Sequence, residues 1–353
     1  MNNKKIKTAI LGATGSVGQK FVELLSNHPW FEINELAASD KSAGKKYLEA
    51  VNWVMQSPLQ SYLAEKLVLK CVPELESKII FSALDASVAG KIEEEFAQAG
   101  YIVISNARNH RFDEDVPLMV PEVNANHLEL IKFQKYSGGG AIVTNPNCST
   151  IGLVMALKPL QENFGLEAVN VVTMQAISGG GYPGVPSMDI LDNVIPFIGG
   201  EEEKMENEPL KILGSLNENN KIKFSEMKIS AQCNRVSVID GHTECVQVKF
   251  KKRVSKEKII EAWENFSAEP QKLNLPFAPK NPLVYFEENK YPQPRMHRNL
   301  GNGMSVAIGR LRECSLFDYK FVVLSHNTIR GAAGGTILIA ELMKAKGYLE
   351  KYL

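Results

Sequence analysis

The sequence lacks the features that mark secreted, membrane-spanning or nucleic-acid-binding proteins. Its five cysteines are odd in number, widely spaced and never arranged as C-x-x-C, so neither a disulfide framework nor a zinc site is indicated. Lysine plus arginine equals aspartate plus glutamate, at 40 each, which argues against general binding to nucleic acid or membrane surfaces. No apolar run is long enough to span a bilayer, and the N-terminus leads straight into a strand-like segment instead of a signal peptide. We therefore expect a cytoplasmic protein without a metal centre.

The length and pattern of the chain predict two domains. Its 353 residues are 44% hydrophobic, which is enough for a substantial core. In the first part, strands alternate with helices, as in a parallel sheet with helical crossovers: strands at 6–11, 32–38, 78–82 and 101–105, and helices at 19–26 and 87–99. After residue 148 the pattern predicts a mixed or antiparallel sheet, with strands at 168–177, 228–238, 243–250 and 304–310. The final segment, 331–348, is expected to be a helix.

A glycine run follows the first predicted strand and opens a helix. Gly12, Gly15 and Gly18 are spaced as G-x-x-G-x-x-G. Glycines allow the backbone to turn tightly and to approach a pyrophosphate, whose charge then lies at the helix N-terminus. The position favours a dinucleotide site, and the alternative is a tight strand–helix turn that binds nothing.

The end of the second predicted strand bears on the choice of dinucleotide. Asp40 would hold a ribose 2′-hydroxyl, as in NAD proteins, whereas Ser39, Lys41 and Ser42 would hold a 2′-phosphate, as in NADP proteins. Spacing alone leaves both alternatives open, together with that of a solvated polar loop.

One cysteine has a special position. Cys148 follows the turn-forming residues 145–147 and precedes a strongly apolar run at 151–157. If that run is a helix, Cys148 lies at its N-terminus, where free N–H groups and the helix dipole favour a thiolate. Such a thiolate is a nucleophile suited to a carbonyl carbon, and the alternative is a buried structural cysteine.

Two further segments carry candidate catalytic side chains. Gln175 precedes a glycine turn at 179–181, and residues 234–244 resemble a hairpin with Asp240-Gly241 as its two-residue turn. That hairpin would place Arg235 and His242 on one face, where the guanidinium can clamp a carboxylate and the imidazole can act as an acid or base. A three-residue loop would break this alignment.

Taken together and in order along nearly the whole chain, these segments resemble the aspartate-β-semialdehyde dehydrogenase family, in particular its archaeal and fungal branch. The matching segments are 12–18, 39–46, 106–110, 145–150, the strand at Gln175 with its glycine turn, 201–213, 235–242 and 327–334. The S-C-T-T-N motif of the mechanistically related glyceraldehyde-3-phosphate dehydrogenases is absent.

The resemblance implies an α/β fold with two domains. Residues 1–147 would form a Rossmann-like, parallel-sheet, NADP-binding domain, completed by 327–353 because the C-terminal helix returns to it. Residues 148–326 would form an α+β catalytic and dimerisation domain. The family forms dimers and some tetramers, so a homodimer or homotetramer is expected.

The resemblance also implies a reaction, the reversible NADP-dependent conversion of aspartyl phosphate to aspartate semialdehyde through a thioester on Cys148. His242 would be the acid/base, and Gln175 would orient the intermediate. The remaining roles follow by position: Arg235 for the substrate carboxylate, Glu208 for its amine, and Arg108, Asn147 and Lys211 for phosphate. Cofactor contacts would come from Gly12, Thr14, Gly15, Ser16, Val17, Ser39, Lys41, Ser42, Ser178, Gly179 and Asn327.

Three points weigh on this assignment. Pro209 lies between Glu208 and Lys211, so the two can share a helix face only if that helix begins close to Asn207. Relatives that reduce malonyl-CoA or succinyl-CoA through the same thioester are the enzymatic alternative, and a non-catalytic dinucleotide-binding protein is the alternative of another class. Lys41 stands where the family often has arginine, which weakens the case for NADP over NAD.

Overall fold

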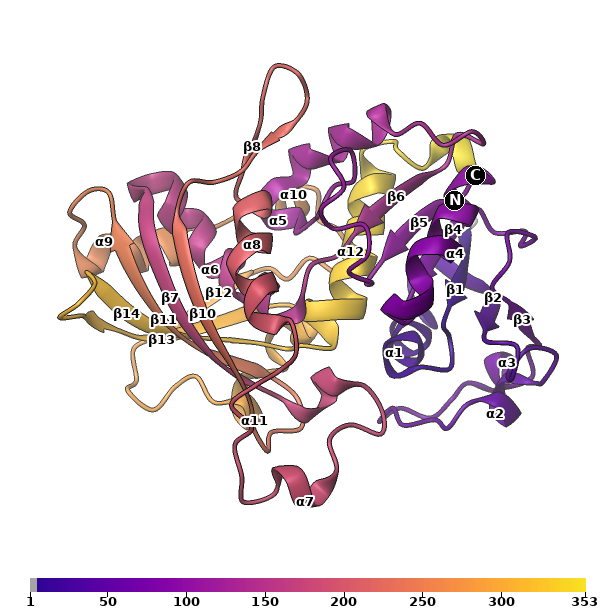
Figure 1. Ribbon diagram of the computed structural model, residues 1–353, viewed down its shortest axis with the longest axis horizontal. Coiled ribbons are helices and arrows are strands. Elements are labelled where there is room, and N and C mark those ends of the chain that lie inside the picture. The colour runs from indigo at the N-terminus through magenta and orange to yellow at the C-terminus, as the bar shows by residue number, and fades with distance from the viewer. Residues whose placement is uncertain (1–4) are drawn as a thin grey trace. The chain divides into compact units, whose positions relative to one another are not determined.

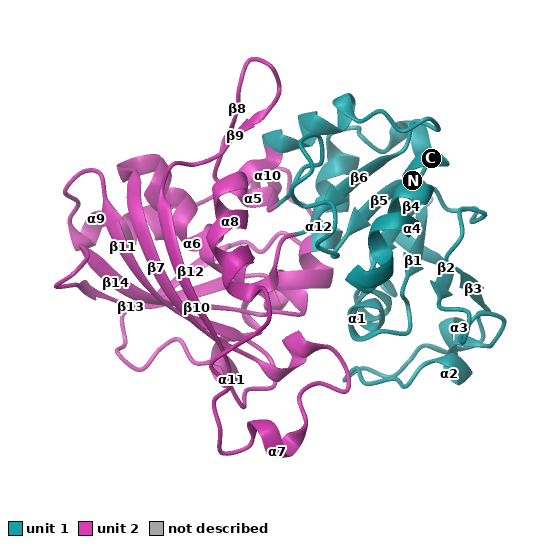
Figure 2. Ribbon diagram, viewed as in Figure 1, with its two compact units in different colours: residues 1–119, 126–145, 336–353 teal, residues 120–125, 146–335 magenta. Residues whose placement is uncertain are grey.

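The computed structural model describes residues 5–353, and their contacts divide the chain into two compact units (Figures 1 and 2). Unit 1 contains residues up to 119, 126–145 and 336–353, and unit 2 contains 120–125 and 146–335. The C-terminal residues therefore return to the first unit, as predicted. No helix within residues 5–353 has the length and apolar character needed to cross a bilayer.

Unit 1 is built on a six-stranded parallel sheet in the order β3-β2-β1-β4-β5-β6. This is the strand order of dinucleotide-binding folds, in which ligands bind at the carboxyl ends of the strands. Helices α1 and α4 pack on the sheet (Figure 1). The elements are β1 (Ile6–Leu11), α1 (Ser16–Leu25), β2 (Phe31–Ala38), α2 (Tyr47–Ala50), α3 (Ser61–Ala64), β3 (Val68–Lys70), β4 (Ile79–Ser82), α4 (Ala86–Gln98), β5 (Ile102–Ser105), the 3-10 helix η1 (Ala125–Phe133) and β6 (Ala141–Thr144).

The strands β4, β5 and β6 are buried at every residue. Strands of a parallel sheet that are covered on both faces become continuous apolar runs, which is why Ile79 to Phe81 and Ile102 to Ile104 carry no polar alternation. Two of these six strands, β3 and β6, were not predicted.

Unit 2 contains a six-stranded mixed sheet in the order β10-β7-β11-β14-β13-β12, with α6 packed on it. Its main elements are α5 (Pro121–Asn124), α6 (Cys148–Phe164), β7 (Leu166–Gln175), α7 (Ser187–Ile190), α8 (Glu201–Ile212), β10 (Lys228–Arg235), β11 (His242–Phe250), α9 (Lys256–Glu264), β12 (Leu283–Phe286), β13 (Val306–Glu313) and β14 (Tyr319–Ser325). Its shorter elements are the 3-10 helix η2 (Ile177–Gly180), β8 (Ser215–Leu216), β9 (Ile222–Lys223), α10 (Glu269–Lys272), α11 (Pro294–His297), the 3-10 helix η3 (Leu300–Gly303) and the π-helical turn η4 (Ile329–Ala333).

The last helix, α12 (Gly334–Ala345), begins at the end of unit 2 and continues into unit 1, where the 3-10 turn η5 (Glu350–Tyr352) follows it. The expected helix over 331–348 is therefore shorter than predicted. Its first residues form η4 instead.

The predicted hairpin around Asp240-Gly241 was wrong. Strands β10 and β11 do not pair with each other, because β7 lies between them, parallel to β10 and antiparallel to β11. The chain after Arg235 instead crosses the end of β7, where Val236 N donates to Gln175 O and Ile177 N donates to Val238 O. A turn signal in the sequence predicts only that the chain reverses locally. It does not show which strand pairs with each side of the turn, because that depends on contacts with segments distant in the sequence.

A buried ion pair connects the two segments of chain that make up unit 2. Arg330 donates two hydrogen bonds to the Glu122 carboxylate, at 2.7 and 2.5 Å, and neither side chain is exposed. This pair attaches η4 to the short helix α5. Because both charges are desolvated, each depends on the other for its compensation.

We expect Arg330→Met to lower the free energy of unfolding by about 3–5 kcal/mol, since it leaves the Glu122 carboxylate buried without its partner. The exposed pair Lys46–Glu65 supplies the control, and Lys46→Ala should cost less than about 1 kcal/mol. Urea denaturation measures both variants. Equal losses in the two would contradict this interpretation of the buried pair.

Candidate functional site

Cys148 occupies the first position of α6, as predicted. The preceding residue, Asn147, is the N-cap, and its Oδ1 accepts hydrogen bonds from Ser149 N at 2.9 Å and Thr150 N at 3.3 Å. The cap fixes the first turn of the helix. Cys148 is half-buried, so a small electrophile can reach the sulfur beside the free N–H groups of the helix mouth.

His242 lies against the sulfur. It opens β11, and its Nε2 is 3.1 Å from Cys148 Sγ. Its other ring nitrogen, Nδ1, accepts the backbone N–H of Ala176 at 3.0 Å. An N–H donor at Nδ1 requires a lone pair there, so in the neutral ring the hydrogen is on Nε2 and faces the sulfur. Complete burial, together with the Arg235 guanidinium, lowers the pKa of His242 to about 3, so the ring is neutral at physiological pH.

Arg235 and Gln175 lie beside His242 at the ends of adjacent strands. Arg235 pairs with Gln175 in the β10–β7 register, and its Nη1 donates to Ala176 O at 2.7 Å. The glycine turn after β7 closes over the group. A Cβ on Gly179 would lie only 2.9 Å from Arg235 Nη1 and 3.1 Å from His242 Cε1. The predicted meeting of Arg235 with His242 therefore occurs, but through β7 and not through a hairpin.

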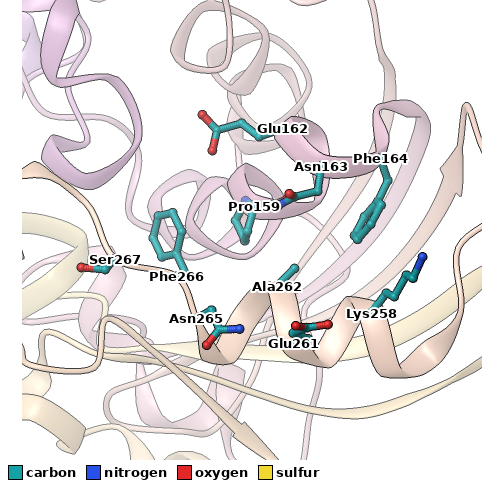
Figure 3. Close-up of a pocket in the computed structure, with 10 residues that line it drawn as sticks. All are labelled: Pro159, Glu162, Asn163, Phe164, Lys258, Glu261, Ala262, Asn265, Phe266 and Ser267. Carbon is teal, nitrogen blue, oxygen red and sulfur yellow. The ribbon is translucent and has the colours of Figure 1, made fainter.

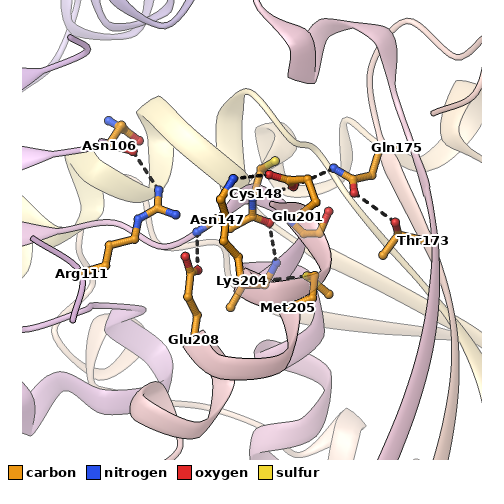
Figure 4. A network of polar contacts seen from close by, with 12 residues as sticks. Asn106, Arg111, Asn147, Cys148, Thr173, Gln175, Glu201, Lys204, Met205 and Glu208 are labelled. Atoms are coloured by element: carbon orange, nitrogen blue, oxygen red, sulfur yellow. Dashed lines mark hydrogen bonds and ion pairs between the residues drawn. The ribbon is translucent and has the colours of Figure 1, made fainter. Parts of the chain in front are cut away.

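Glu201 is the functional candidate that the sequence reasoning missed. Its Oε2 accepts from Asn147 Nδ2 at 2.8 Å and from Gln175 Nε2 at 3.1 Å, and its Oε1 accepts from Lys204 (Figure 4). Burial alone would raise the pKa of Glu201, but Lys204 and the two amides hold it below its ordinary value. The carboxylate is thus charged and connects the helix cap to the end of β7.

The placement of Glu201 depends on where α8 begins. In the sequence analysis, Glu208 and Lys211 could share a helix face only if the helix began close to Asn207, but α8 begins at Glu201 and contains Pro209 in its interior. Among the three consecutive glutamates, only the first is buried. A pattern of i, i+3 charges, Glu201 and Lys204, was the available signal.

The residues predicted to bind substrate have different surroundings. Glu208 is fully buried, and its Oε2 accepts the backbone N–H of Asn147 at 2.7 Å (Figure 4). Lys211, on the same helix, is 1% exposed. Arg108 is exposed and belongs to unit 1. Of the predicted substrate residues, the structure therefore groups Arg235, Asn147 and Glu208 around the first turn of α6.

The predicted dinucleotide residues of unit 1 fit an anion. The N-cap of α1 is Gly15, which makes no side-chain cap hydrogen bond, and the first turn from Ser16 onwards carries no acidic residue. An uncapped helix N-terminus of this kind favours phosphate. Gly12 has a positive φ of 73°, and a Cβ there would lie 2.5 Å from Ala83 O, so this turn requires glycine.

The loop after β2 forms a turn in which Ser42 N and Ala43 N donate to Ser39 O. The Asp40 carboxylate is directed to Lys70, at 3.5 Å. That pairing leaves Ser39, Lys41 and Ser42 as the polar groups of the turn, with Lys41 exposed. The donor set suits a ribose phosphate better than a ribose diol.

The predicted nicotinamide-side residues of unit 2 are bound to one another. Asn327 Nδ2 donates to Ser178 Oγ at 2.7 Å, and its Oδ1 accepts from Gly241 N at 2.8 Å. Four residues further on, a Cβ on Gly331 would lie 2.7 Å from Cys148 Cβ. The segment after β14 thus passes close to the nucleophile, which only glycine at position 331 permits.

A separate groove lies between α6 and α9 (Figure 3). It is lined by residues from the C-terminal part of α6, including Pro159, and from α9 and the segment after it, including Phe266. Cys148 is at the opposite end of α6, so about 16 Å or more of helix separates it from this groove. The groove therefore does not belong to the candidate site.

The sequence is similar to known proteins of one family. The sequence matches the family description "Semialdehyde dehydrogenase, NAD binding domain" over residues 7–131 and "Semialdehyde dehydrogenase, dimerisation domain" over residues 157–330. It is 50% identical to an aspartate-semialdehyde dehydrogenase of Archaeoglobus fulgidus over 96% of this chain and 98% of the relative. For that of Saccharomyces cerevisiae the identity is 49%, over 99% and 100%.

The fold matches as well. A crystal structure of the Candida albicans aspartate-semialdehyde dehydrogenase with NADP superposes with a TM-score of 0.90 at 48% identity, covering 98% of this chain and 99% of that one. The chain therefore belongs to the aspartate-semialdehyde dehydrogenase family.

Proposed function

We propose that this protein is an NADP-dependent aspartate-semialdehyde dehydrogenase that interconverts L-aspartyl-4-phosphate and L-aspartate-4-semialdehyde through a thioester on Cys148. The observation that carries the proposal is the 3.1 Å contact between Cys148 Sγ and His242 Nε2 at the mouth of α6. The 50% identical relative bears the same name. In the reductive direction, from L-aspartyl-4-phosphate to L-aspartate-4-semialdehyde, the reaction serves lysine, threonine and methionine biosynthesis.

The chemistry needs a nucleophile and hydrogen-bond donors. In the oxidative direction, Cys148 Sγ attacks the aldehyde carbon, so that a C–S bond forms and the carbonyl oxygen becomes an alkoxide. The His242 Nε2–H and the N–H groups at the start of α6 are placed to stabilise that oxygen. Bound NADP supplies the hydride acceptor. Phosphate then attacks the thioester carbon, the C–S bond breaks, and Cys148 leaves as a thiolate.

In this scheme, His242 acts as a hydrogen-bond donor. The Ala176 N–H at Nδ1 opposes the tautomer that would free Nε2 to accept a proton, so the base half of the expected acid/base role lacks support from the geometry. No proton transfer is required between thiolate attack and thioester formation. The Gln175 amide donates to Glu201 and accepts from Thr173, and these two hydrogen bonds would hold it in place beside the intermediate.

Charged residues around the sulfur suit an amino-acid substrate. Arg235 offers a guanidinium for the α-carboxylate. We assign the substrate ammonium to Glu201 in preference to Glu208, because the lowered pKa of Glu201 keeps its carboxylate charged and that carboxylate lies between Gln175 and Asn147, the residue before Cys148. Arg108, Asn147 and Lys211 stay predicted phosphate residues.

The cofactor and assembly complete the proposal. The uncapped N-terminus of α1 and the turn at Ser39, Lys41 and Ser42 would hold the phosphates of NADP. Ser178, Gly179 and Asn327 stay the predicted contacts on the nicotinamide side. The matched dimerisation domain supports a homo-oligomer, for which we propose a homodimer or homotetramer. The domain limits of 1–147 with 327–353, and 148–326, also stay predictions.

Replacing the nucleophile gives the direct test of the reaction. Cys148→Ala should abolish phosphate-dependent reduction of NADP by aspartate semialdehyde, with at least about a 10³-fold loss, while NADP binding measured by calorimetry stays unchanged. Cys233→Ala is the matched control and should keep its activity. Malonyl-CoA is assayed in parallel, since turnover of that substrate alone would favour a CoA-thioester reductase. Normal turnover by Cys148→Ala would refute the scheme.

The pH dependence tests the role of His242. Its pKa is lowered to about 3 from an ordinary 6.5, so the ring is neutral from about pH 5 to 9 and contributes no ionisation to kcat/KM in that window. His242→Asn should therefore reduce kcat about 10²- to 10³-fold without moving either limb of the profile. An acid limb near pH 6–7 that vanishes in this variant would show that His242 titrates as a base.

Substrate analogues separate the two glutamates. Glu201→Gln should lower kcat/KM for aspartate semialdehyde more than tenfold, about 1.4 kcal/mol, but have little effect on succinate semialdehyde, which lacks the amino group. Glu208→Gln should affect both substrates equally, because the Glu208 carboxylate accepts the backbone N–H of Asn147 and so supports the start of α6 whichever substrate is bound. If Glu208→Gln instead lowered kcat/KM for aspartate semialdehyde alone, the ammonium site would be assigned to Glu208.

A further inference from the structure

A buried acid with no assigned role lies on the strand that carries His242. The Glu244 side chain is 0% exposed, and neither of its carboxyl oxygens has a hydrogen-bond partner among residues 5–353. Burial raises the pKa of Glu244 well above its ordinary value. An unpaired carboxylate in such surroundings is costly, whereas a neutral acid still needs a partner for its O–H.

Two hydroxyl groups near Glu244 share this condition. Ser149 Oγ and Ser325 Oγ are also buried and have no hydrogen-bond partner among the described residues. The two serines come from different elements, α6 and β14, and α6 packs against both β11 and β14. Three orphaned polar groups in one layer form a polar site that protein atoms alone do not satisfy.

Gly152 shows that the Glu244 and Ser325 side chains are close together. A Cβ built on Gly152 would lie 2.7 Å from Ser325 Oγ and 3.4 Å from Glu244 Oε1, so both oxygens border the same point. Ser149 is one turn earlier on the same face of α6. Glycine at position 152 keeps a side chain away from these oxygens, which a Cβ would crowd.

The site adjoins each catalytic residue. Ser149 directly follows Cys148, Ser325 is paired with His242 in the β11–β14 register, and Glu244 is two residues beyond His242 on the same face of β11. Burial, together with the negative charge that an ionised Glu244 would carry, raises the pKa values of the Cys233 thiol on β10 and the Cys245 thiol on β11.

We propose that Glu244, as a neutral acid, binds a buried water together with Ser149 and Ser325, and that this site positions the first turn of α6 against His242. A water with two to four polar partners satisfies such groups and is costly to remove. Here the acid O–H donates to the water, and the water bonds the two serine hydroxyls. Glu244 is thus a positioning residue for the proposed reaction.

Matched substitutions test the protonation and the positioning separately. Glu244→Gln keeps the size and a neutral donor, so we expect kcat within about twofold of the natural protein. Glu244→Leu fills a similar volume but leaves both serines without the acid, and we expect kcat to fall about tenfold or more at nearly unchanged KM. The exposed Glu162→Gln is the control and should change nothing.

Stability against pH gives a second readout that does not depend on activity. The folded state keeps the Glu244 proton, while the unfolded chain loses it above about pH 4.5, so unfolding releases a proton. Raising the pH from 5 to 8 should therefore lower the Tm of the natural protein relative to Glu244→Gln. A constant Tm difference over that range would show that Glu244 does not hold a proton in the folded state.

A crystal structure of the natural protein completes the test. We expect one ordered water within hydrogen-bond reach of Glu244, Ser149 and Ser325, and the same water in Glu244→Gln. A dry site, or equal kcat losses in Glu244→Gln and Glu244→Leu, would overturn the proposal. These outcomes are distinct from failure of the proposed function, which the Cys148→Ala assay reports independently.

Discussion

The capping of α6 by Asn147 is the interaction on which the rest of the site depends. The Asn147 side chain fixes the first turn through Ser149 and Thr150, its backbone N–H is held by Glu208, and its amide donates to Glu201. These bonds place the sulfur at the positive end of a helix of 17 residues. The ends of the strands that carry Gln175, Arg235 and His242 lie around the same point.

The order of strands in the sheet brings Gln175, Arg235 and His242 together. Because β7 lies between β10 and β11, the last residue of one and the first of the other flank the end of β7. The backbone continuing from β7 performs two tasks there. Ala176 N–H fixes the tautomer of His242, and Ala176 O holds the guanidinium of Arg235. Rigid strand ends and a capped helix hold the groups before any substrate arrives, which is the condition for electrostatic stabilisation of a developing charge.

Local signals in the sequence were sufficient for part of this account. The turn-forming residues 145–147 before an apolar run predict a helix with Cys148 at its N-terminus, and alternating strands and helices predict the parallel sheet. The hairpin prediction failed because pairing of β7 with both β10 and β11 depends on contacts between distant segments. Glu201 was missed because the preference against interior proline moved the start of α8 past it, whereas tertiary packing tolerates Pro209 within the helix.

The most direct measurement of the central claim is the trapping of the acylated enzyme. Aspartate semialdehyde and NADP are mixed with the protein without phosphate, the reaction is quenched in acid, and the modified peptide is mapped by mass spectrometry. The account predicts a burst of NADPH that approaches one per active site and an aspartyl group on Cys148. A burst without acylation, or acylation of Cys233 or Cys245 instead, would contradict it.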